Sequence, residues 1–397
     1  MKKAMAILLA CLMAFTLFAC NENKAPVETA PPPADDAPAA MTPDSMPDTP
    51  GSPPASGNVE IGTYDPDRDY FDREPYSVMY ISYQAGSFGE LIEMNLQGWA
   101  SVLNIKFDRL DAQTMDDFYS TMEICANEGY DGFVLDADPT LGAKTLELAE
   151  ELGIKAWLGA TSVIRDDDDT MLWPGVTMDS YWAGQEQMRW AFDNYDNYYD
   201  NEVDMSKLGV IFCTYSVIPN LQLVEDGASE WVETNAVPLG FDMGNYFIAD
   251  ATGMGFDAPT AYDLVSAIMS TNSHVENWIV GTCMEPYGVG ASRAAEELGK
   301  EGSAIVVSQD GTTVFAQWDT GYDGCWVAAL TSPLQYFTEP IMCGVLALIE
   351  GEATPETLWP DHVQPGNKYA NRIVLSTMLT KENYVEFHEE LAAKAPF

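Results

Sequence analysis

The sequence predicts an α/β protein with two doubly wound parallel sheets, and three observations lead to this fold class. From residue 76 onward, apolar strand-like runs alternate with amphipathic helix-like runs. The acidic run 193–204 interrupts the alternation, which then restarts. A chain of 397 residues is also too long for one ordinary core. Because alternating βα units favour parallel strands with right-handed crossovers, we expect two lobes of the same class.

The expected elements fall into two sets, one on each side of the acidic run. The first set has strands at 76–83, 105–112, 131–138, 154–160 and 175–178, and helices at 88–104, 114–129, 140–153 and 179–195. The second set has strands at 207–215, 236–243, 277–284 and 303–310, and helices at 221–233, 261–272 and 288–299.

One predicted strand, in the stretch GYDGFVLDADP, runs directly into carboxylates. Its apolar residues Phe133, Val134 and Leu135 do not alternate with polar ones, which is typical of a strand covered on both faces. Ligands of such sheets bind beyond the carboxyl ends of the strands. Asp136 at this end fits either ligand contact or turn chemistry, and Asp138 fits a helix cap.

The N-terminus combines positive charge, a short apolar run and a cysteine. Two lysines precede the apolar run 4–18, which is too short to span a bilayer. The sequence LFAC at 17–20 resembles the lipobox of bacterial lipoproteins, in which Cys20 is acylated and becomes the first mature residue. We therefore expect a signal peptide at 1–19 and an extracytoplasmic protein attached to the cell membrane by a lipid on Cys20.

Residues 20–75 are expected to form a tether, because most of this segment is rich in Pro, Ala, Asp, Ser and Thr and poor in large apolar residues. Its last part spaces Asp65, Asp67 and Asp69 as a calcium loop does. That loop would need Gly at its sixth position, which is Tyr70 here, so turn chemistry is the alternative. The run RDDDD at 165–169 leaves the same two readings open.

Composition excludes several function classes. The formal net charge is −44, with 62 acidic and 18 basic residues, so no basic stripe exists for nucleic acid. Only three histidines are present, and no C-x-x-C, G-x-S-x-G or Walker motif occurs. Cysteines after Cys20 lie in apolar contexts and suggest buried thiols. We expect no cofactor, no metal and no enzymatic activity.

Several short motifs follow one another in a characteristic order: DAQ at 111–113, EGYDGFVLDADPT at 128–140, VTMDSYWAG at 176–184, GTCMEPYGVGASRAAEELGK at 281–300 and VVSQDGT at 306–312. Their order resembles that of the sugar-type (type I) periplasmic binding proteins and the ligand-binding halves of LacI-like repressors. A lipid tether, rather than a DNA-binding segment, precedes them and selects the transporter-associated branch.

The resemblance implies two lobes joined by three hinge strands that close over a ligand. It places the first lobe at 76–203 plus about 331–356, and the second at 204–330 plus about 357–397. It also implies a monomer whose partners are a small-molecule ligand, a sugar by this family's pattern, and an ABC permease in the membrane.

The resemblance also assigns candidate ligand-binding residues. In the first lobe these are Gln84, Phe88, Asp136 and Thr161, where Phe88 matches the aromatic residue that the family places on the sugar. In the second lobe they are Gln222, Glu285, Gln309 and Asp310. The family's Arg falls on Gln222 and its Phe-Asp-Gly on 309–311, so Asp310 matches while the stacking Phe is replaced.

Three tryptophans could serve either as ligand contacts or as packing residues: Trp173, Trp318 and Trp326. Trp173, in MLWPG, fits a stacker at the cleft mouth or a loop anchor, and the other two fit a core better.

Three functions are compatible with this sequence. The leading one is a lipid-anchored binding protein of an ABC-type importer for a small neutral carbohydrate or polyol. The second is a sensory binding protein that presents its ligand to a chemoreceptor or sensor kinase. The third, a glycoside hydrolase with two carboxylates, lacks a visible activated nucleophile.

Overall fold

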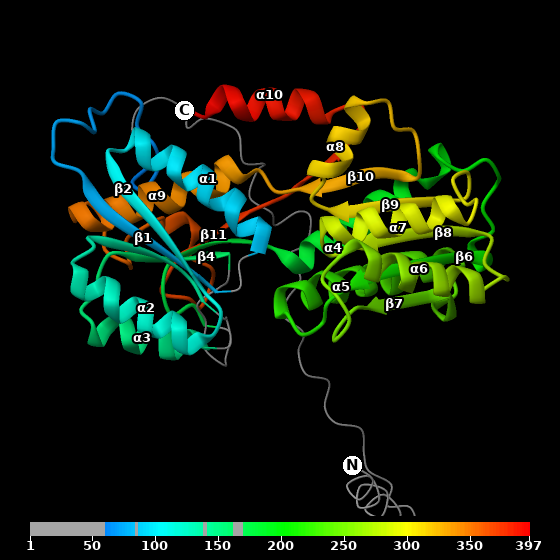
Figure 1. Ribbon diagram of the computed structural model, residues 1–397, viewed down its shortest axis with the longest axis horizontal. Coiled ribbons are helices and arrows are strands. Elements are labelled where there is room, and N and C mark those ends of the chain that lie inside the picture. The colour runs from blue at the N-terminus through cyan, green and yellow to red at the C-terminus, as the bar shows by residue number, and fades with distance from the viewer. Residues whose placement is uncertain (1–59, 84–85, 138–140, 162–169) are drawn as a thin grey trace, which may run out of the picture. The chain divides into compact units, whose positions relative to one another are not determined.

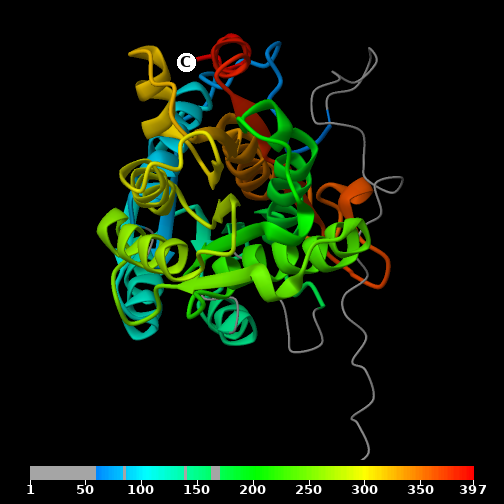
Figure 2. The same cartoon turned by 90° about the vertical axis from the view of Figure 1, so that its right-hand side faces the viewer.

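The computed structural model describes residues 60–83, 86–137, 141–161 and 170–397. It contains two six-stranded sheets, each covered by helices on both faces (Figure 1 and Figure 2). The expected signal peptide, the lipid on Cys20 and most of the expected tether lie outside the described residues and stay predictions. Among the described residues, no helix is long and apolar enough to cross a membrane.

The first sheet is wholly parallel, as the sequence predicts. Its helices are α1 (Gly86–Val102), α2 (Met115–Glu128), α3 (Gly142–Glu151) and α9 (Leu334–Glu350). In spatial order its strands are β11 (Asn371–Val374), β5 (Gly175–Met178), β4 (Trp157–Thr161), β3 (Gly132–Asp136), β1 (Tyr76–Tyr83) and β2 (Ile105–Ala112).

Strand β3 shows why its sequence does not alternate. Val134 packs into the core that contains α1 and α9, whereas Phe133 and Leu135 pack into the core with α2 and α3. All five residues of β3 are buried. The strand is therefore covered on both faces, which fits a continuous apolar run.

The second sheet repeats this plan, with one antiparallel edge strand, β12, beside β10. In order its strands are β12 (Thr377–Thr380), β10 (Trp326–Thr331), β9 (Ala304–Gln309), β8 (Asn277–Thr282), β6 (Leu208–Thr214) and β7 (Tyr246–Asp250). Its helices are α4 (Ser180–Asn194), α5 (Pro219–Trp231), α6 (Ala258–Thr271), α7 (Glu285–Glu297), α8 (Thr312–Asp319) and α10 (Tyr384–Lys394).

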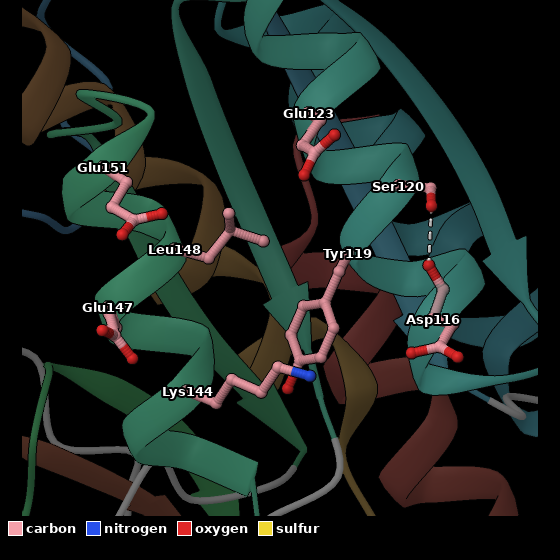
Figure 3. Close-up of a pocket in the computed structure, with 8 residues that line it drawn as sticks. All are labelled: Asp116, Tyr119, Ser120, Glu123, Lys144, Glu147, Leu148 and Glu151. Atoms are coloured by element: carbon pink, nitrogen blue, oxygen red, sulfur yellow. Dashed lines mark hydrogen bonds between the residues drawn. The ribbon is translucent and has the colours of Figure 1, made fainter.

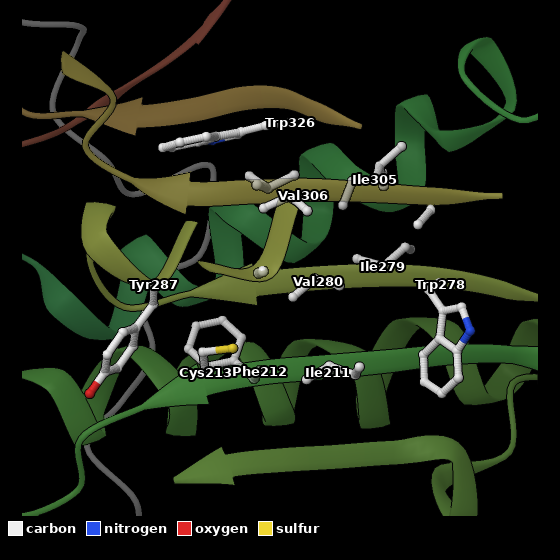
Figure 4. Packing of buried hydrophobic residues seen from close by; sticks show 14 of the residues in the cluster. Ile211, Phe212, Cys213, Trp278, Ile279, Val280, Tyr287, Ile305, Val306 and Trp326 are labelled. Atoms are coloured by element: carbon white, nitrogen blue, oxygen red, sulfur yellow. The ribbon is translucent and has the colours of Figure 1, made fainter. Parts of the chain in front are cut away.

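The core of the second sheet is rich in large apolar side chains (Figure 4). Trp278 and Trp326 are fully buried among Ile211, Phe212 and Val306. Cys213, Cys283 and Cys325 are buried free thiols in the same core, so the reading of these cysteines as packing residues is confirmed. Trp318 is also buried there, which identifies it as a core residue.

The boundary expected at residue 203 lies elsewhere in the structure, because α4 belongs to the second core. Met188 and Ala191 of α4 are buried in that core. Helices α4 and α5 also cross at two glycines: a Cβ on Gly184 would lie 1.8 Å from the Val224 carbonyl oxygen, and one on Gly227 would lie 2.0 Å from that of Tyr181. Only glycine permits this backbone approach.

The C-terminal part of the chain is also divided differently from the expectation. Leu358, Trp359, Ala370 and Val374 pack in the first core, whereas the resemblance implies that about 357–397 belong to the second lobe. The second core takes the chain only from β12 onward, with Leu379 and Tyr384 buried in it. The chain therefore passes between the two sheets three times, at 179, at 332–333 and at 375–376. This agrees with the three hinge strands that the resemblance implies.

The described end of the expected tether, residues 60–75, is part of the first lobe. Tyr70 is only 5% exposed and packs in the first core. Arg68 and Arg73 form ion pairs with Glu350 at 2.6 and 3.1 Å. The tether expected to end at residue 75 is therefore too long. The Pro and Asp residues of this segment suggested a tether, although it also contains buried aromatic residues such as Tyr70.

The strand expected at 236–243 is wrong. Irregular helical turns occupy 232–239, and β7 begins only at Tyr246. Pro238 lacks the N–H with which a strand residue can pair with its neighbour, and Gly240 adopts a left-handed conformation with φ 105°. These two residues were the available signal for a turn.

Candidate functional site

The candidate ligand-binding residues concentrate at the carboxyl ends of parallel strands. Asp136 ends β3 and Thr161 ends β4 in the first sheet. In the second sheet Gln309 ends β9, and Glu285 begins the helix that follows β8. This edge is where open α/β sheets bind ligands. Gln84 lies outside the described residues, and the described part of Phe88 is its place in α1.

Asp136 is held by hydroxyl groups of the surrounding strands. Its carboxylate accepts hydrogen bonds from Tyr80 Oη at 3.4 Å, from Ser82 Oγ at 3.3 Å and from Thr161 Oγ1. Asp136 is only 8% exposed. Burial and the nearby Asp136 charge raise the pKa of Tyr80 well above its usual value, so the phenol stays a proton donor. Asp136 thus orders the strand ends around it.

Thr161 has an unusual backbone conformation for a β-branched residue. Its φ is 56°, in the left-handed region that favours glycine. The hydrogen bond to Asp136 fixes its side chain within the first lobe. Such conformations occur where the surrounding structure enforces them, often at binding sites.

Asp310 adopts the same left-handed conformation directly after β9, with φ 57°. Its N–H donates to the Leu330 carbonyl at 3.0 Å, and its own carbonyl accepts from Ser308 Oγ at 2.6 Å. Burial and the neighbouring Glu285 charge raise the pKa of Asp310 to about 7. Its carboxyl group can therefore donate as well as accept hydrogen bonds near neutral pH.

Glu285 and Gln309 have partners within the second lobe. The Glu285 carboxylate accepts a hydrogen bond from the N–H of Thr313. The side-chain amides of Gln187 and Gln309 lie 3.5 Å apart. Gln187 is buried in α4, so Gln309 contacts the helix that the resemblance places in the first lobe.

Gln222 is turned toward its own helix. Its amide donates to Glu225 at 2.9 Å and to Asp226 at 2.7 Å. Glu225 is 3% exposed, and burial raises its pKa. The structure therefore gives the Gln222 amide two carboxylate partners in α5, and the carry-over of the family's ligand contact to Gln222 stays a prediction.

The sequence reading missed an aromatic group at the ends of β6 and β7. Phe256 is 51% exposed, and its ring meets the ring of Tyr215 edge-on at 5.1 Å. Tyr287 lies behind it, with ring centroids 6.2 Å apart. Exposed aromatic faces pack well against the C–H faces of sugars. The signal available was an aromatic residue in the Gly-rich loop after a strand.

Asp250 fixes the two loops that carry these aromatic residues. Its carboxylate accepts hydrogen bonds from Ser216 Oγ at 2.6 Å and from the N–H of Thr252 at 2.9 Å. Although desolvation acts in the opposite direction, the hydrogen bonds from Ser216 and Thr252 lower the pKa of Asp250 to about 2. This carboxylate was also missed, because the sequence placed the strand too early.

Trp173 is a loop anchor. Its ring stacks on Trp157 with centroids 4.8 Å apart, and its Nε1–H donates to the Trp157 carbonyl at 2.7 Å. Of the two readings of Trp173, the structure therefore supports packing.

Two surface hollows among the described residues lie away from the strand ends. One of about 480 Å³ is a groove between α2 and α3, lined by Tyr119, Lys144 and several carboxylates (Figure 3). Another, of about 250 Å³, includes Ala304 and Trp326 at the starts of β9 and β10. Both are polar surface hollows rather than enclosed ligand sites.

No group of three metal-ligating side chains is assembled in the part of the chain that the structure describes. Asp65 accepts the N–H of Asp67, and Asp69 accepts that of Phe71, each at 2.9 Å. These carboxylates make local turns, which is the turn reading of the calcium-like spacing. The acidic run 165–169 lies outside the described residues.

Comparison with known proteins identifies the architecture. No family model matches the chain, and no curated protein matches it in sequence. A sugar-binding protein of a sugar ABC transporter from Bacillus halodurans has a TM-score of 0.59 and 16% identity, covering 77% of this chain and 98% of its own. A Caulobacter myo-inositol binding protein has a TM-score of 0.60 and 15% identity, covering 78% and 95%.

A third solved structure, a 5-methylthioribose transporter solute-binding protein from Thermotoga lettingae, has a TM-score of 0.60 and 17% identity, covering 82% of this chain and 94% of its own. At these identities the likeness shows the fold. The chain therefore has the two-lobed α/β fold of the type I periplasmic binding proteins.

Proposed function

We propose that this protein is a lipid-anchored substrate-binding protein of an ABC-type importer, which captures a small neutral carbohydrate or polyol. The observation that carries the proposal is the placement of Thr161 and Asp310 at matching strand ends of the two sheets. Solved neighbours with this fold include proteins crystallised with D-fucose, D-allose and myo-inositol. The neighbours are solute-binding proteins and not enzymes, which argues against a hydrolase.

The proposed mechanism is hinge closure about the three connections between the lobes. A ligand that contacts strand ends of both lobes makes its full set of hydrogen bonds only when the lobes are closed. It therefore shifts an open–closed equilibrium by its differential affinity for the two states. A membrane permease would then recognise the closed form of a monomeric, extracytoplasmic binding protein.

The polar groups at the strand ends suit hydroxyl-rich ligands. Asp310 and Gln309 offer a carboxyl group and an amide in the second lobe, and Phe256 offers an aromatic face. Planar carboxyl and amide groups pair with adjacent hydroxyls, while aromatic faces cover the apolar side of a sugar ring. The lipid anchor rests on the LFAC sequence that ends at Cys20.

A thermal-shift screen tests the ligand class. The panel should contain D-allose, D-fucose, myo-inositol and 5-methylthioribose, together with amino acids as a control class. A ligand at a hundredfold excess over its Kd stabilises the protein by about 2.7 kcal/mol. Stabilisation by an amino acid and by no sugar or polyol would contradict the proposal.

Two further measurements complete this test. Above pH 7, where the Asp310 carboxyl group is ionised, Asp310→Asn should weaken binding of the stabilising sugar or polyol about tenfold or more, because a hydrogen bond to a charged group contributes roughly 1.5–3 kcal/mol. Stimulation of an ABC permease's ATPase by the liganded protein supports import. Binding of the liganded protein to a chemoreceptor or sensor kinase instead would favour the sensory alternative.

A further inference from the structure

Helix α8, which directly follows Asp310, begins without a side-chain cap of its own. Its N-cap residue is Gly311, so the helix start has no local side chain to accept a first-turn N–H. A Cβ at Gly311 would lie 2.5 Å from the Cβ of Ala329, so the close approach to β10 favours glycine here. Uncapped N–H groups at a helix start need another acceptor.

Glu285 supplies that acceptor from a different helix. Its carboxylate accepts the N–H of Thr313, the second residue of α8, although the two residues are 28 positions apart in the chain. Glu285 is itself the first residue of α7, three positions after the last residue of β8. A carboxylate between two helix N-termini is electrostatically favoured at both.

This contact ties Glu285 to the backbone that presents Asp310. The Asp310 peptide is bonded on one side to Leu330 and on the other to Ser308, and α8 begins two residues later. The left-handed φ of Asp310 is strained for a non-glycine residue, so it needs such surrounding restraints. Glu285 provides the restraint on the C-terminal side of the turn.

We propose that Glu285 is a positioning residue that caps α8 and thereby holds the turn of the ligand-binding residue Asp310. The ligand contact of Asp310 rests on the proposed function, whereas the cap and the turn do not. A consequence follows from charge: the Glu285 carboxylate lies close enough to Asp310 to disfavour its ionised form.

The groups around Asp310 decide how its titration should respond. Burial contributes most to the elevation of the Asp310 pKa, the N–H of Ser332 opposes it, and the charge of Glu285 from α7 adds to it. The side chains of Gln309 and of Gln187 in α4 are neutral. Glu285 is therefore the charged neighbour whose removal should lower the Asp310 pKa.

Two substitutions separate the cap from the charge. Glu285→Gln keeps an oxygen that can accept the Thr313 N–H but removes the charge. Glu285→Ala removes both. Glu297→Gln is a matched control, because Glu297 ends the same helix and pairs with the exposed Arg293. Asp310→Asn assigns the Asp310 resonance.

The experiment is a carboxyl-carbon NMR titration of the ligand-free protein labelled at aspartate, combined with amide exchange at Thr313. The Asp310 midpoint should fall in both Glu285 variants and stay unchanged in Glu297→Gln. Exchange at Thr313 should accelerate about tenfold or more in Glu285→Ala and little in Glu285→Gln, since the cap persists there.

Either of two results overturns the proposal. One is an Asp310 titration midpoint that is the same with and without the Glu285 charge. The other is protection of the Thr313 amide from exchange that survives Glu285→Ala. A merely structural role of Glu285 would leave the Asp310 midpoint in Glu285→Gln where it is in the wild type. Because neither measurement needs a ligand, failure of the sugar screen would overturn the proposed function and leave the cap intact.

Discussion

Thr161 and Asp310 occupy corresponding positions in the two sheets and share one backbone conformation. Thr161 ends β4 and Asp310 follows β9, the third strand in each spatial order, with φ of 56° and 57°. Both sheets continue with corresponding strands on either side. The duplicated architecture therefore extends to a strained turn at one strand end, although no residue-level repeat is visible in the sequence.

Asp136→Asn should destabilise the protein. The substitution replaces one carboxylate oxygen, which accepts hydroxyl hydrogens, by an amide nitrogen that donates. An unsatisfied buried polar group costs about 1–3 kcal/mol, so we expect a loss in that range in urea denaturation.

Asp67→Asn is the matched control for Asp136→Asn, because Asp67 is exposed and outside the strand ends. Equal stability of the Asp136 and Asp67 variants would show that the fold does not need the charged Asp136 carboxylate as acceptor for the hydroxyl groups of Tyr80, Ser82 and Thr161. If Asp136→Asn keeps its stability but loses sugar affinity, Asp136 is a ligand contact and not the turn residue that its hydrogen bonds suggest.

Asp310→Asn should change the pH dependence of stability in a defined direction. The folded-state pKa of Asp310 is about 7, whereas the ordinary value for an aspartate is 3.8. Between these values the folded protein holds a proton that the unfolded chain has lost, so this group makes stability fall as pH rises. The asparagine variant lacks this dependence and should gain stability relative to the wild type from pH 4 to pH 8.

Urea denaturation at several pH values measures this difference, for which each pKa unit corresponds to about 1.4 kcal/mol. Asp250→Asn is an opposite-sign control. The pKa of Asp250 is lowered to about 2, so its contribution is present above pH 4 and is lost as pH falls toward 2. A stability difference for Asp310→Asn that does not vary with pH would contradict the elevated pKa.

The alternating pattern predicts most of the fold because strand and helix periodicities are local properties of the sequence. All five strands expected in the first set are present, and β3 is buried on both faces. The lobe boundary could not be predicted, since α4 has an apolar face that would suit either sheet. Its choice depends on the Gly184–Gly227 crossing, a contact between segments far apart in the sequence.

The candidate site is only partly visible in sequence for a related reason. Asp136, Thr161 and Asp310 lie at the carboxyl ends of strands, and strand ends can be predicted from the sequence pattern. Partners cannot be read in this way. The cap from Glu285 to Thr313 and the Gln222 contacts with Glu225 and Asp226 depend on side-chain directions that no motif specifies.

We expect a chain that starts at Glu60 to be as stable as the mature protein. A chain starting there retains Tyr70 and the Arg68–Glu350 ion pair, and should unfold at the same temperature as the mature protein. A chain starting at Asp72 loses both. Burying a large apolar side chain contributes roughly 1.5–3 kcal/mol, so the shorter chain should melt several degrees lower. Identical melting of the two chains would show that 60–71 is dispensable.

Cys20→Ala should prevent lipid attachment. The thiol of Cys20 is the acylation site in the proposed lipobox, so the variant should accumulate unprocessed or be released from the membrane. Mass spectrometry of the membrane fraction measures the modification. Cys11→Ala, inside the apolar signal run, is the control and should be processed normally. An unmodified Cys20 in membrane-attached wild type would contradict the prediction.

Phe256→Ala should weaken sugar binding while leaving the second core intact. Phe256 is 51% exposed although its ring contacts that of Tyr215, so part of the residue is accessible to a ligand. The second core packs around buried aromatic residues such as Trp326, and Phe256 is not part of it. Replacing Phe256 should therefore leave that core intact. The loss of a sugar-stacking face should reduce affinity about tenfold, since aromatic contacts contribute roughly 0.5–1.5 kcal/mol beyond area burial.

Isothermal titration with whichever panel sugar or polyol stabilises the wild type measures the effect of Phe256→Ala. Val217→Ala is the matched control: Val217 is exposed on the neighbouring loop after β6 and has no aromatic face. We expect the control to bind within about twofold of the wild type, a difference of only about 0.4 kcal/mol. Phe256→Tyr should restore most of the affinity, because the ring face is kept and the hydroxyl group can remain in solvent.

If the Phe256→Ala protein binds as tightly as the wild type, the aromatic group after β6 and β7 is a surface feature. The second lobe would then contact its ligand through Gln309 and Asp310 without a stacking face.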